Sequence, residues 1–402
     1  MTARSTVVGD RRRAAADRTG SKSRHPARRV SASRPASPAP PPAAFYAIAV
    51  VATVFTLLGL AMVMSATSIA QFHKGNSPWS SFQRQVMWAG FGAAAVWLAL
   101  KVPMHLMRRW VGPFTLLSLC LMALPLLPNV GASVNGARAW IRVGELTFQP
   151  SELLKLTLML QCAHLLAGRQ SEPNDFGRTL RPVAILGVLG ALLCLLQGDL
   201  GSAIVLVGIV FAMAFIAGAP IGLMAVTGTL AAAAGLLIVM ASDRRAARFT
   251  AFLDIAAHKD HLSYQTWQAM IATAQGGLTG SGVGRGESKL GEFLPLAHSD
   301  FIFAVVAEEL GMIGVIAVLG GFLVMVYAGI QVAMATQDRF HSIVAAGVVA
   351  WFALQTTINV GGVVGIMPVT GLTLPFFSAG GSSLLVTLAA TGLLLNVARN
   401  VR

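Results

Sequence analysis

The chain has 402 residues, of which 55% are hydrophobic and only 11% are charged, and its formal net charge is +14. Soluble domains average about 25% charged residues, so this composition, with a mean hydropathy of +0.68, excludes an ordinary soluble enzyme. It indicates a protein that lies largely in the bilayer, where backbone polarity requires helices or a closed barrel. Long unbroken apolar runs favour helices, because barrel strands would alternate.

The first 43 residues carry ten Lys/Arg against two Asp and end in a proline-rich run, 35–42. Such a run is typical of a disordered linker. A basic segment beside a membrane span indicates a cytoplasmic tail attracted to anionic headgroups rather than a nucleic-acid partner. The sequence therefore predicts a disordered basic cytoplasmic tail over 1–43 and a transmembrane domain over 44–402.

Ten apolar segments follow, and a stretch of about 20 such residues can cross the hydrocarbon core. They are 44–66, 83–101, 111–128, 150–168, 182–197, 200–218, 221–241, 301–332, 342–365 and 378–397. The expected fold class is an all-α polytopic membrane protein with about ten transmembrane helices. A large outer loop, 242–300, separates helices 7 and 8. Lys and Arg in the short loops place both termini in the cytoplasm.

Four polar segments then lie on the outer side. In the first, Glu152 and Lys155 are three residues apart and share a helix face. Ionisable residues at membrane depth are costly and by default functional, although a structural ion pair near the interface is the alternative. In the second, Asp199 stands at a hairpin between two spans. It either caps the next helix or belongs to a site, and both interpretations stay open.

The third segment is the long loop, with a glycine-rich run over 276–284. Such backbone can approach a phosphate, but a flexible loop looks the same. Asp300 stands where a span begins, so desolvation should act on its carboxyl group and suit it as a base. Glu309, further along that span, is expected to be structural. The fourth segment, 359–383, is dense in proline and glycine, which favours an irregular outer loop buried in protein or lining a wet cavity.

Together these segments resemble the SEDS family (shape, elongation, division and sporulation), which includes the FtsW and RodA proteins, from about residue 45 onward. The motifs that carry the resemblance are Asn135-Gly136-Ala137 with Trp140-Ile141, Gln149-Pro150-Ser151-Glu152 with Lys155, Leu294-Pro295 with His298 and 300–304, Glu308-Glu309-Leu310-Gly311, and 368–371 through 380–383. The long basic tail resembles division-type FtsW members more than rod-type RodA members.

The resemblance implies a peptidoglycan glycosyltransferase that polymerises lipid II on the periplasmic face of the bacterial inner membrane and releases undecaprenyl diphosphate. It also implies a class B penicillin-binding protein (FtsI-like) and other division proteins as partners. The family's essential loop aspartate maps onto Asp300, the expected catalytic base. The expected substrate-binding residues are Arg138, Glu152, Lys155, Asp199, Arg248, Lys289 and His298. A divalent cation, Mg²⁺ or Mn²⁺, is a candidate cofactor, and no organic cofactor is expected.

Four positions depart from the usual family pattern: Ala139, Ile255, Leu296 and Ala379 stand where arginine, proline, glutamate and tyrosine are common. Two other classes of function use the same spans. A lipid II flippase would place polar residues along a path through the midplane, and a non-catalytic division scaffold would need no base.

Overall fold

The computed structural model describes residues 42–73, 75–127, 131–134, 136–144, 146–168, 176–289 and 293–401. These residues form one unit of the chain, Pro41–Arg402. The basic tail predicted over 1–43 lies almost wholly outside the described residues, so its disorder stays a prediction.

Ten long helices in the described part of the chain match the ten predicted apolar segments. They are α1 Ala43–His73, α2 Ser80–Lys101, α3 Met104–Ala123, α4 Pro150–Gly168, α5 Arg181–Leu196, α6 Leu200–Ile216, α7 Ile221–Met240, α10 Ile302–Ala335, α11 Arg339–Val363 and α12 Gly381–Arg399. A 3-10 turn, Leu124–Leu126, extends α3, and a π-helical turn, Phe176–Leu180, precedes α5. By length and composition, seven helical segments of the described ranges can cross a membrane, and α6 is apolar but shorter.

A small antiparallel sheet between α3 and α4 is an addition to the expected all-α fold. Its strands are β1 Gly131–Val134, β2 Ala137–Val143 and β3 Leu146–Phe148, in the order β1-β2-β3. Gly136 precedes β2 with a φ of 86°, a conformation that glycine adopts without steric cost. The strands are too short and too polar for a search based on apolar spans to detect.

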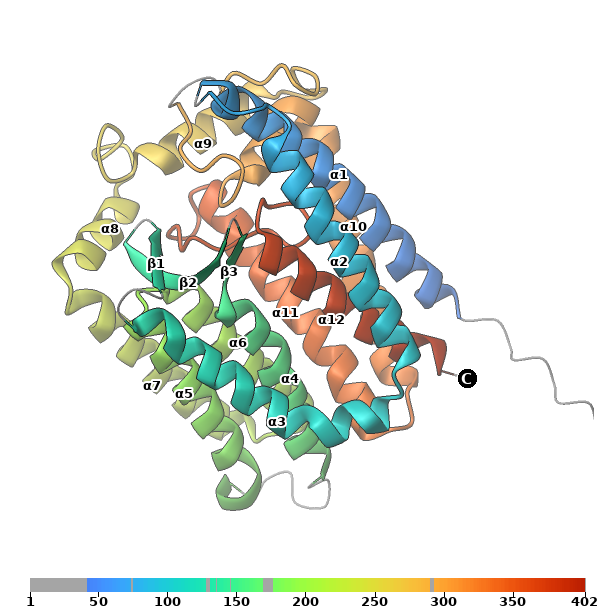
Figure 1. Cartoon of the computed structure of the whole chain (residues 1–402). Coiled ribbons are helices and arrows are strands. Elements are labelled where there is room, and N and C mark those ends of the chain that lie inside the picture. The colour runs from blue at the N-terminus through green and yellow to red at the C-terminus, as the bar shows by residue number, and fades with distance from the viewer. Residues whose placement is uncertain are drawn as a thin grey trace, which may run out of the picture. The chain divides into compact units, whose positions relative to one another are not determined.

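The predicted outer loop, 242–300, contains two further helices, α8 Asp243–Leu253 and α9 Tyr264–Gln275. Both are shorter than the bilayer is thick. Figure 1 shows α8, α9 and the sheet at the same end of the helix bundle. This end carries most of the polar residues that the sequence singles out.

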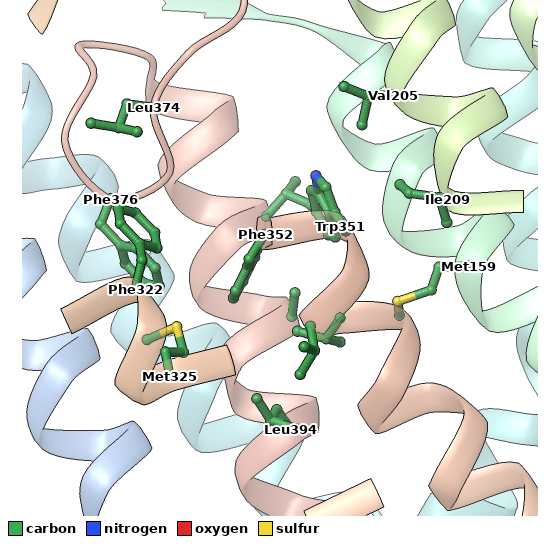
Figure 2. Packing of buried hydrophobic residues seen from close by; sticks show 14 of the residues in the cluster. Met159, Val205, Ile209, Phe322, Met325, Trp351, Phe352, Leu374, Phe376 and Leu394 are labelled. Atoms are coloured by element: carbon green, nitrogen blue, oxygen red, sulfur yellow. The ribbon is translucent and has the colours of Figure 1, made fainter. Parts of the chain in front are cut away.

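Helix α12 packs against α1, α2, α4, α10 and α11. Close approach to α2 depends on small residues, because a Cβ at Gly392 of α12 would meet the backbone of Val96 on α2. Small residues at such positions let helices pack closely in a membrane, where dispersion replaces the hydrophobic effect. Figure 2 shows the buried apolar side chains of this region, with Trp351 and Phe352 of α11 near its centre.

Helix α10 is interrupted at Gly311, whose φ is 65° and ψ is −162°. The interruption frees two carbonyls of α10 for the glycine-rich loop. The amides of Ser281 and Gly282 donate to the carbonyls of Glu308 and Glu309 at 2.9 and 3.0 Å. Because these groups satisfy one another, the irregular backbone carries no unpaired carbonyl at these two positions.

The segment between α11 and α12, 364–380, is irregular, and its second half is buried, as its proline and glycine content predicts. Phe376 anchors it: the ring centroid lies 6.0 Å from that of Phe55 on α1 and 6.5 Å from that of Phe322 on α10. Figure 2 shows the rings of Phe322 and Phe376 lying together. A Cβ at Gly59 of α1 would collide with the Phe376 carbonyl, so α1 can hold this segment only with a glycine there.

Candidate active site

Asp300 lies two residues before α10 begins and is half-buried. Other segments hold three successive carbonyls, those of residues 298–300. Ala379 N donates to the first at 2.8 Å, Ser378 Oγ to the second at 2.6 Å, and Asn359 Nδ2 to the third at 2.9 Å. The backbone that carries the Asp300 side chain is therefore fixed by α11 and by the segment before α12.

Burial raises the pKa of Asp300 to about 6, because a buried carboxyl group resists ionisation. A hydrogen bond from the Ser299 side chain opposes this rise, and the negative charge of Asp199 adds to it. The expectation that desolvation acts on Asp300 is confirmed. A carboxylate with a pKa near neutrality can take a proton from a hydroxyl group and release it afterwards, as a general base must.

Asp199 caps α6, which is one of the two interpretations that the sequence left open, and its role in a site stays a prediction. Its Oδ1 accepts from Ser202 N at 2.9 Å and caps α6. Its Oδ2 accepts from Gln149 Nε2 at 3.0 Å and from Ser151 Oγ at 3.4 Å. The cap is thus confirmed, and the second oxygen joins α6 to the start of α4 while the charge acts on Asp300.

Glu152 and Lys155 form the predicted ion pair, with Lys155 Nζ 2.8 Å from Glu152 Oε1. Both side chains are buried. The Lys155 ammonium also donates to Gln355 Oε1 at 3.0 Å and lies 5.4 Å from the centre of the Trp351 ring. Groups from α4 and α11 therefore surround this charge inside the helix bundle.

Gln355 connects the buried ion pair to the segment before α12. Its Oε1 accepts from Trp351 Nε1 at 2.7 Å, and its Nε2 donates to Thr373 O at 2.8 Å. The Thr373 hydroxyl in turn shares a hydrogen bond of 2.8 Å with the hydroxyl of Ser383. The pair and the segment that borders Asp300 thus belong to one hydrogen-bonded network.

Both predicted substrate-binding arginines are exposed at the polar end of the bundle. Arg138 lies on β2, and its backbone N–H donates to Gln197 O at 2.8 Å. That contact places β2 beside the turn that carries Asp199. Arg248 lies on α8, which packs against α7.

Lys289 lies in a separate buried cluster. Its Nζ is 2.5 Å from Glu309 Oε1 and donates to Ser65 Oγ at 2.7 Å. Glu309 is thus the ion-pair partner of Lys289. The structural role of Glu309 and substrate binding by Lys289 both stay predictions. His298 is two residues from Asp300, and its carbonyl is one of the three that accept hydrogen bonds from other segments.

The four departures from the family pattern have different surroundings. Ala139 is fully buried on β2, and Leu296 has a φ of 60°, a left-handed conformation that is uncommon for a residue with a side chain. Ile255 lies near Gly365, just after α11. The backbone N–H of Ala379 donates to the carbonyl of His298, two residues before Asp300 in the loop. This contact does not depend on the side chain at position 379.

Two residues of the site were not singled out as site residues by the sequence: Gln355 and Asn359. Both are buried on α11. Asn359 figured only as an interruption of an apolar segment. Two amides four residues apart share a helix face, and polar groups in such a segment mark functional positions, so a signal for them existed.

Comparison with known proteins places this geometry in a family. The family model described as "Cell cycle protein", which covers FtsW, RodA and SpoVE, matches residues 45–402. The probable peptidoglycan glycosyltransferase FtsW of Geobacter metallireducens is 36% identical over 359 residues, which are 88% of this chain and 94% of the relative. The stage V sporulation protein E of Bacillus subtilis is 35% identical over 355 residues, 88% of this chain and 97% of the relative.

Solved structures agree. A chain from work on the coordination of polymerization and crosslinking by a peptidoglycan synthase complex matches with a TM-score of 0.71 and 30% identity, covering 88% of this chain and 97% of that one. The rod shape determining protein RodA of Thermus thermophilus matches with a TM-score of 0.63 and 30% identity, covering 89% and 97%. The fold is that of a multi-pass helical membrane protein with a polar site at one end. The chain belongs to the FtsW/RodA/SpoVE family, as the motifs predict.

Proposed function

We propose that this protein is a peptidoglycan glycosyltransferase that polymerises lipid II into glycan strands, in the manner of a division-type FtsW. The observation that carries the proposal is the fixed, half-buried carboxyl group of Asp300, whose pKa burial raises to about 6. It lies in a chain related over 88% of its length to proteins named peptidoglycan glycosyltransferase. Relatives named FtsW favour septal synthesis over RodA-type elongation.

In this reaction Asp300 acts as the general base. It takes the proton from the attacking sugar hydroxyl while the oxygen of that hydroxyl forms a bond to the anomeric carbon of the donor sugar. The bond from that carbon to the diphosphate breaks, and undecaprenyl diphosphate leaves with the bonding electrons. The backbone contacts to residues 298–300 would hold the base in place.

The leaving diphosphate needs positive charge. The side chains of Arg138 and Arg248 are exposed, so they are more accessible to a diphosphate than the buried Lys155 and Lys289. A divalent cation such as Mg²⁺ or Mn²⁺ is a further source. No cluster of three or more His, Cys, Asp or Glu side chains occurs among the described residues, so such a cation would rely on few carboxylates and on substrate oxygens, as Mg²⁺ commonly does.

The protein would lie in the bacterial inner membrane with both termini in the cytoplasm and the Asp300 site on the periplasmic side, as the Lys/Arg content of the short loops favours. Its partners would be a class B penicillin-binding protein (FtsI-like) and other division proteins. The match to a chain of a peptidoglycan synthase complex supports an assembly of this kind.

Purified full-length protein in lipid nanodiscs, with and without the penicillin-binding partner, is supplied with labelled lipid II, and glycan strands are separated by length. We expect polymerisation by the wild type and at least a hundredfold loss in Asp300→Asn, since general base catalysis contributes about 10² to 10⁴ in rate. Asp338→Asn is the control, because Asp338 also lies at the start of a long helix, where it is the N-cap of α11. Full activity of Asp300→Asn would exclude the base, and lipid II translocation without polymerisation would favour a flippase.

A further inference from the structure

Two buried asparagines hold the backbone of neighbouring segments in the same way. Asn359 Nδ2 on α11 donates to Asp300 O at 2.9 Å and to Leu372 O at 2.7 Å. Asn396 Nδ2 on α12 donates to two carbonyls at the end of α2, at 2.5 and 3.0 Å. Because a carbonyl only accepts, these contacts identify which atom of each amide group is the nitrogen.

The two asparagines differ in their amide oxygens. Asn396 Oδ1 accepts from Asn400 Nδ2 at 3.1 Å. Asn359 Oδ1 has no hydrogen-bond partner among the described residues, although this side chain is only 5% exposed. Buried polar atoms are nearly always paired, so this oxygen indicates that a donor group binds beside it.

Asn359 and Asp300 line the same small cavity of about 10 Å³, roughly the room that one water needs. The cavity also borders Gly371, whose φ is 74° and where a Cβ would lie 3.7 Å from Asp300 Oδ2. Among the residues that line the cavity, Asp300 is the one with an ionisable side chain. The residues that line the cavity thus include the one that carries the unpaired amide oxygen and the one that carries the carboxyl group.

We propose that this cavity binds one water, which donates one hydrogen to Asn359 Oδ1 and the other to the Asp300 carboxylate, and that Asn359 is a positioning residue for Asp300. The nitrogen of Asn359 holds the backbone of the base, and its oxygen holds the water that solvates the base. A donor to the carboxylate favours its charged form. It acts with the Ser299 hydroxyl and against the burial and the charge of Asp199.

This inference rests on the proposed function in one respect, the role of Asp300 as the base. The bound water can therefore be tested without lipid II. Full-length protein in nanodiscs is treated with a carbodiimide, which reacts with protonated carboxyl groups, between pH 4 and 9, and labelling of Asp300 is followed by peptide mass spectrometry. In Asn359→Leu we expect the labelling midpoint to rise by about one pH unit, equivalent to about 1.4 kcal/mol. Asn396→Leu, which removes an amide with the same two-carbonyl pattern, should leave the midpoint unchanged.

A second variant keeps the Asn359 amide and fills the cavity instead. Val363 also lines the cavity and is buried, so Val363→Ile should displace the water and raise the midpoint in the same direction. The proposal is overturned if both Asn359→Leu and Val363→Ile titrate as the wild type, or if Asn396→Leu shifts the midpoint equally. A shifted midpoint in a protein that does not polymerise lipid II would refute the proposed function and leave this inference standing.

Discussion

A Cβ on Gly201 of α6 would lie 2.5 Å from the carbonyl oxygen of Thr370, so the first turn of α6 touches the segment that borders Asp300. Asp199 caps the same helix two residues earlier. Gly371, the residue after Thr370, faces the Asp300 carboxyl group. This contact between α6 and residues 370–371 explains why the charge of Asp199 acts on Asp300.

Gly201→Ala should therefore weaken the site. The added methyl group must push α6 away from the Thr370 carbonyl, and such overpacking costs about 1–3 kcal/mol. We expect a lower Tm in detergent and a lower rate of lipid II polymerisation. Gly222→Ala is the matched control, because Gly222 is also the second residue of a helix and a Cβ there meets nothing within 4 Å. Equal behaviour of the two variants would contradict the contact.

The Glu152–Lys155 pair should behave as a coupled buried unit. Glu152→Gln or Lys155→Met alone leaves an uncompensated charge inside the bundle, which costs about 3–5 kcal/mol. The double variant removes both charges, so its loss of stability should be much smaller than the sum of the single losses. A double-mutant cycle on unfolding in detergent measures this coupling, and additive losses would show that the ion pair is not a unit.

The same cycle tests the predicted role of Lys155 in substrate binding. If the double variant regains stability and polymerises lipid II normally, Lys155 serves the fold. If stability returns and the KM for lipid II rises, Lys155 also contacts substrate.

Lys289 should prove to be a structural residue. Lys289→Met leaves the buried carboxylate of Glu309 without its ion-pair partner. We expect the free energy of unfolding to fall by about 3–5 kcal/mol, and adding Glu309→Gln should largely restore it. Lys259→Met is the control, because the exposed Lys259 lies over the Trp267 ring at 6.0 Å, and its replacement should change stability by about 0.5 kcal/mol or less. A rescued double variant that still binds lipid II poorly would instead support the role that the sequence predicts for Lys289.

Local patterns predicted much of this site. Seven helical segments of the described ranges follow from apolar length and composition, the Glu152–Lys155 pair from spacing on one helix face, and the Asp199 cap from its place before α6. Each depends on interactions within a few residues or on transfer into the bilayer, so the sequence contains the needed information locally.

Such local patterns could not predict the contacts between residues far apart in the sequence. Lys289 pairs with Glu309, a carboxylate 20 residues away that lies just before the interruption of α10, and Asn359 donates to a carbonyl 59 residues away. These partners are set by how the helices pack, which spacing alone does not determine. For the same reason the exposed Arg138 and the buried Lys289 looked alike in the sequence, although one charge meets solvent and the other an ion-pair partner.

The pH dependence of the reaction should follow Asp300, whose pKa burial raises from 3.8 to about 6. A general base must be deprotonated, so kcat/KM for lipid II polymerisation should fall about tenfold per pH unit below pH 6.

The contribution of Asp300 to the stability of the fold should have the opposite pH dependence and decrease as the pH rises. Between pH 3.8 and about 6 the folded protein binds the Asp300 proton more tightly than the unfolded chain does, so this contribution to stability is present at low pH and is lost as the pH rises through 6.

Asp199→Asn provides the sharper test of this electrostatic link. Removing the negative charge of Asp199 lowers the pKa of Asp300, so the acid limb of the kcat/KM profile should move to lower pH, whatever the change in maximal rate. Asn can still accept the hydrogen bond from Ser202 N, so the α6 cap survives the substitution. A profile that is flat between pH 5 and 7 in the wild type, or an acid limb that moves upward in Asp199→Asn, would show that Asp300 is not the titrating base.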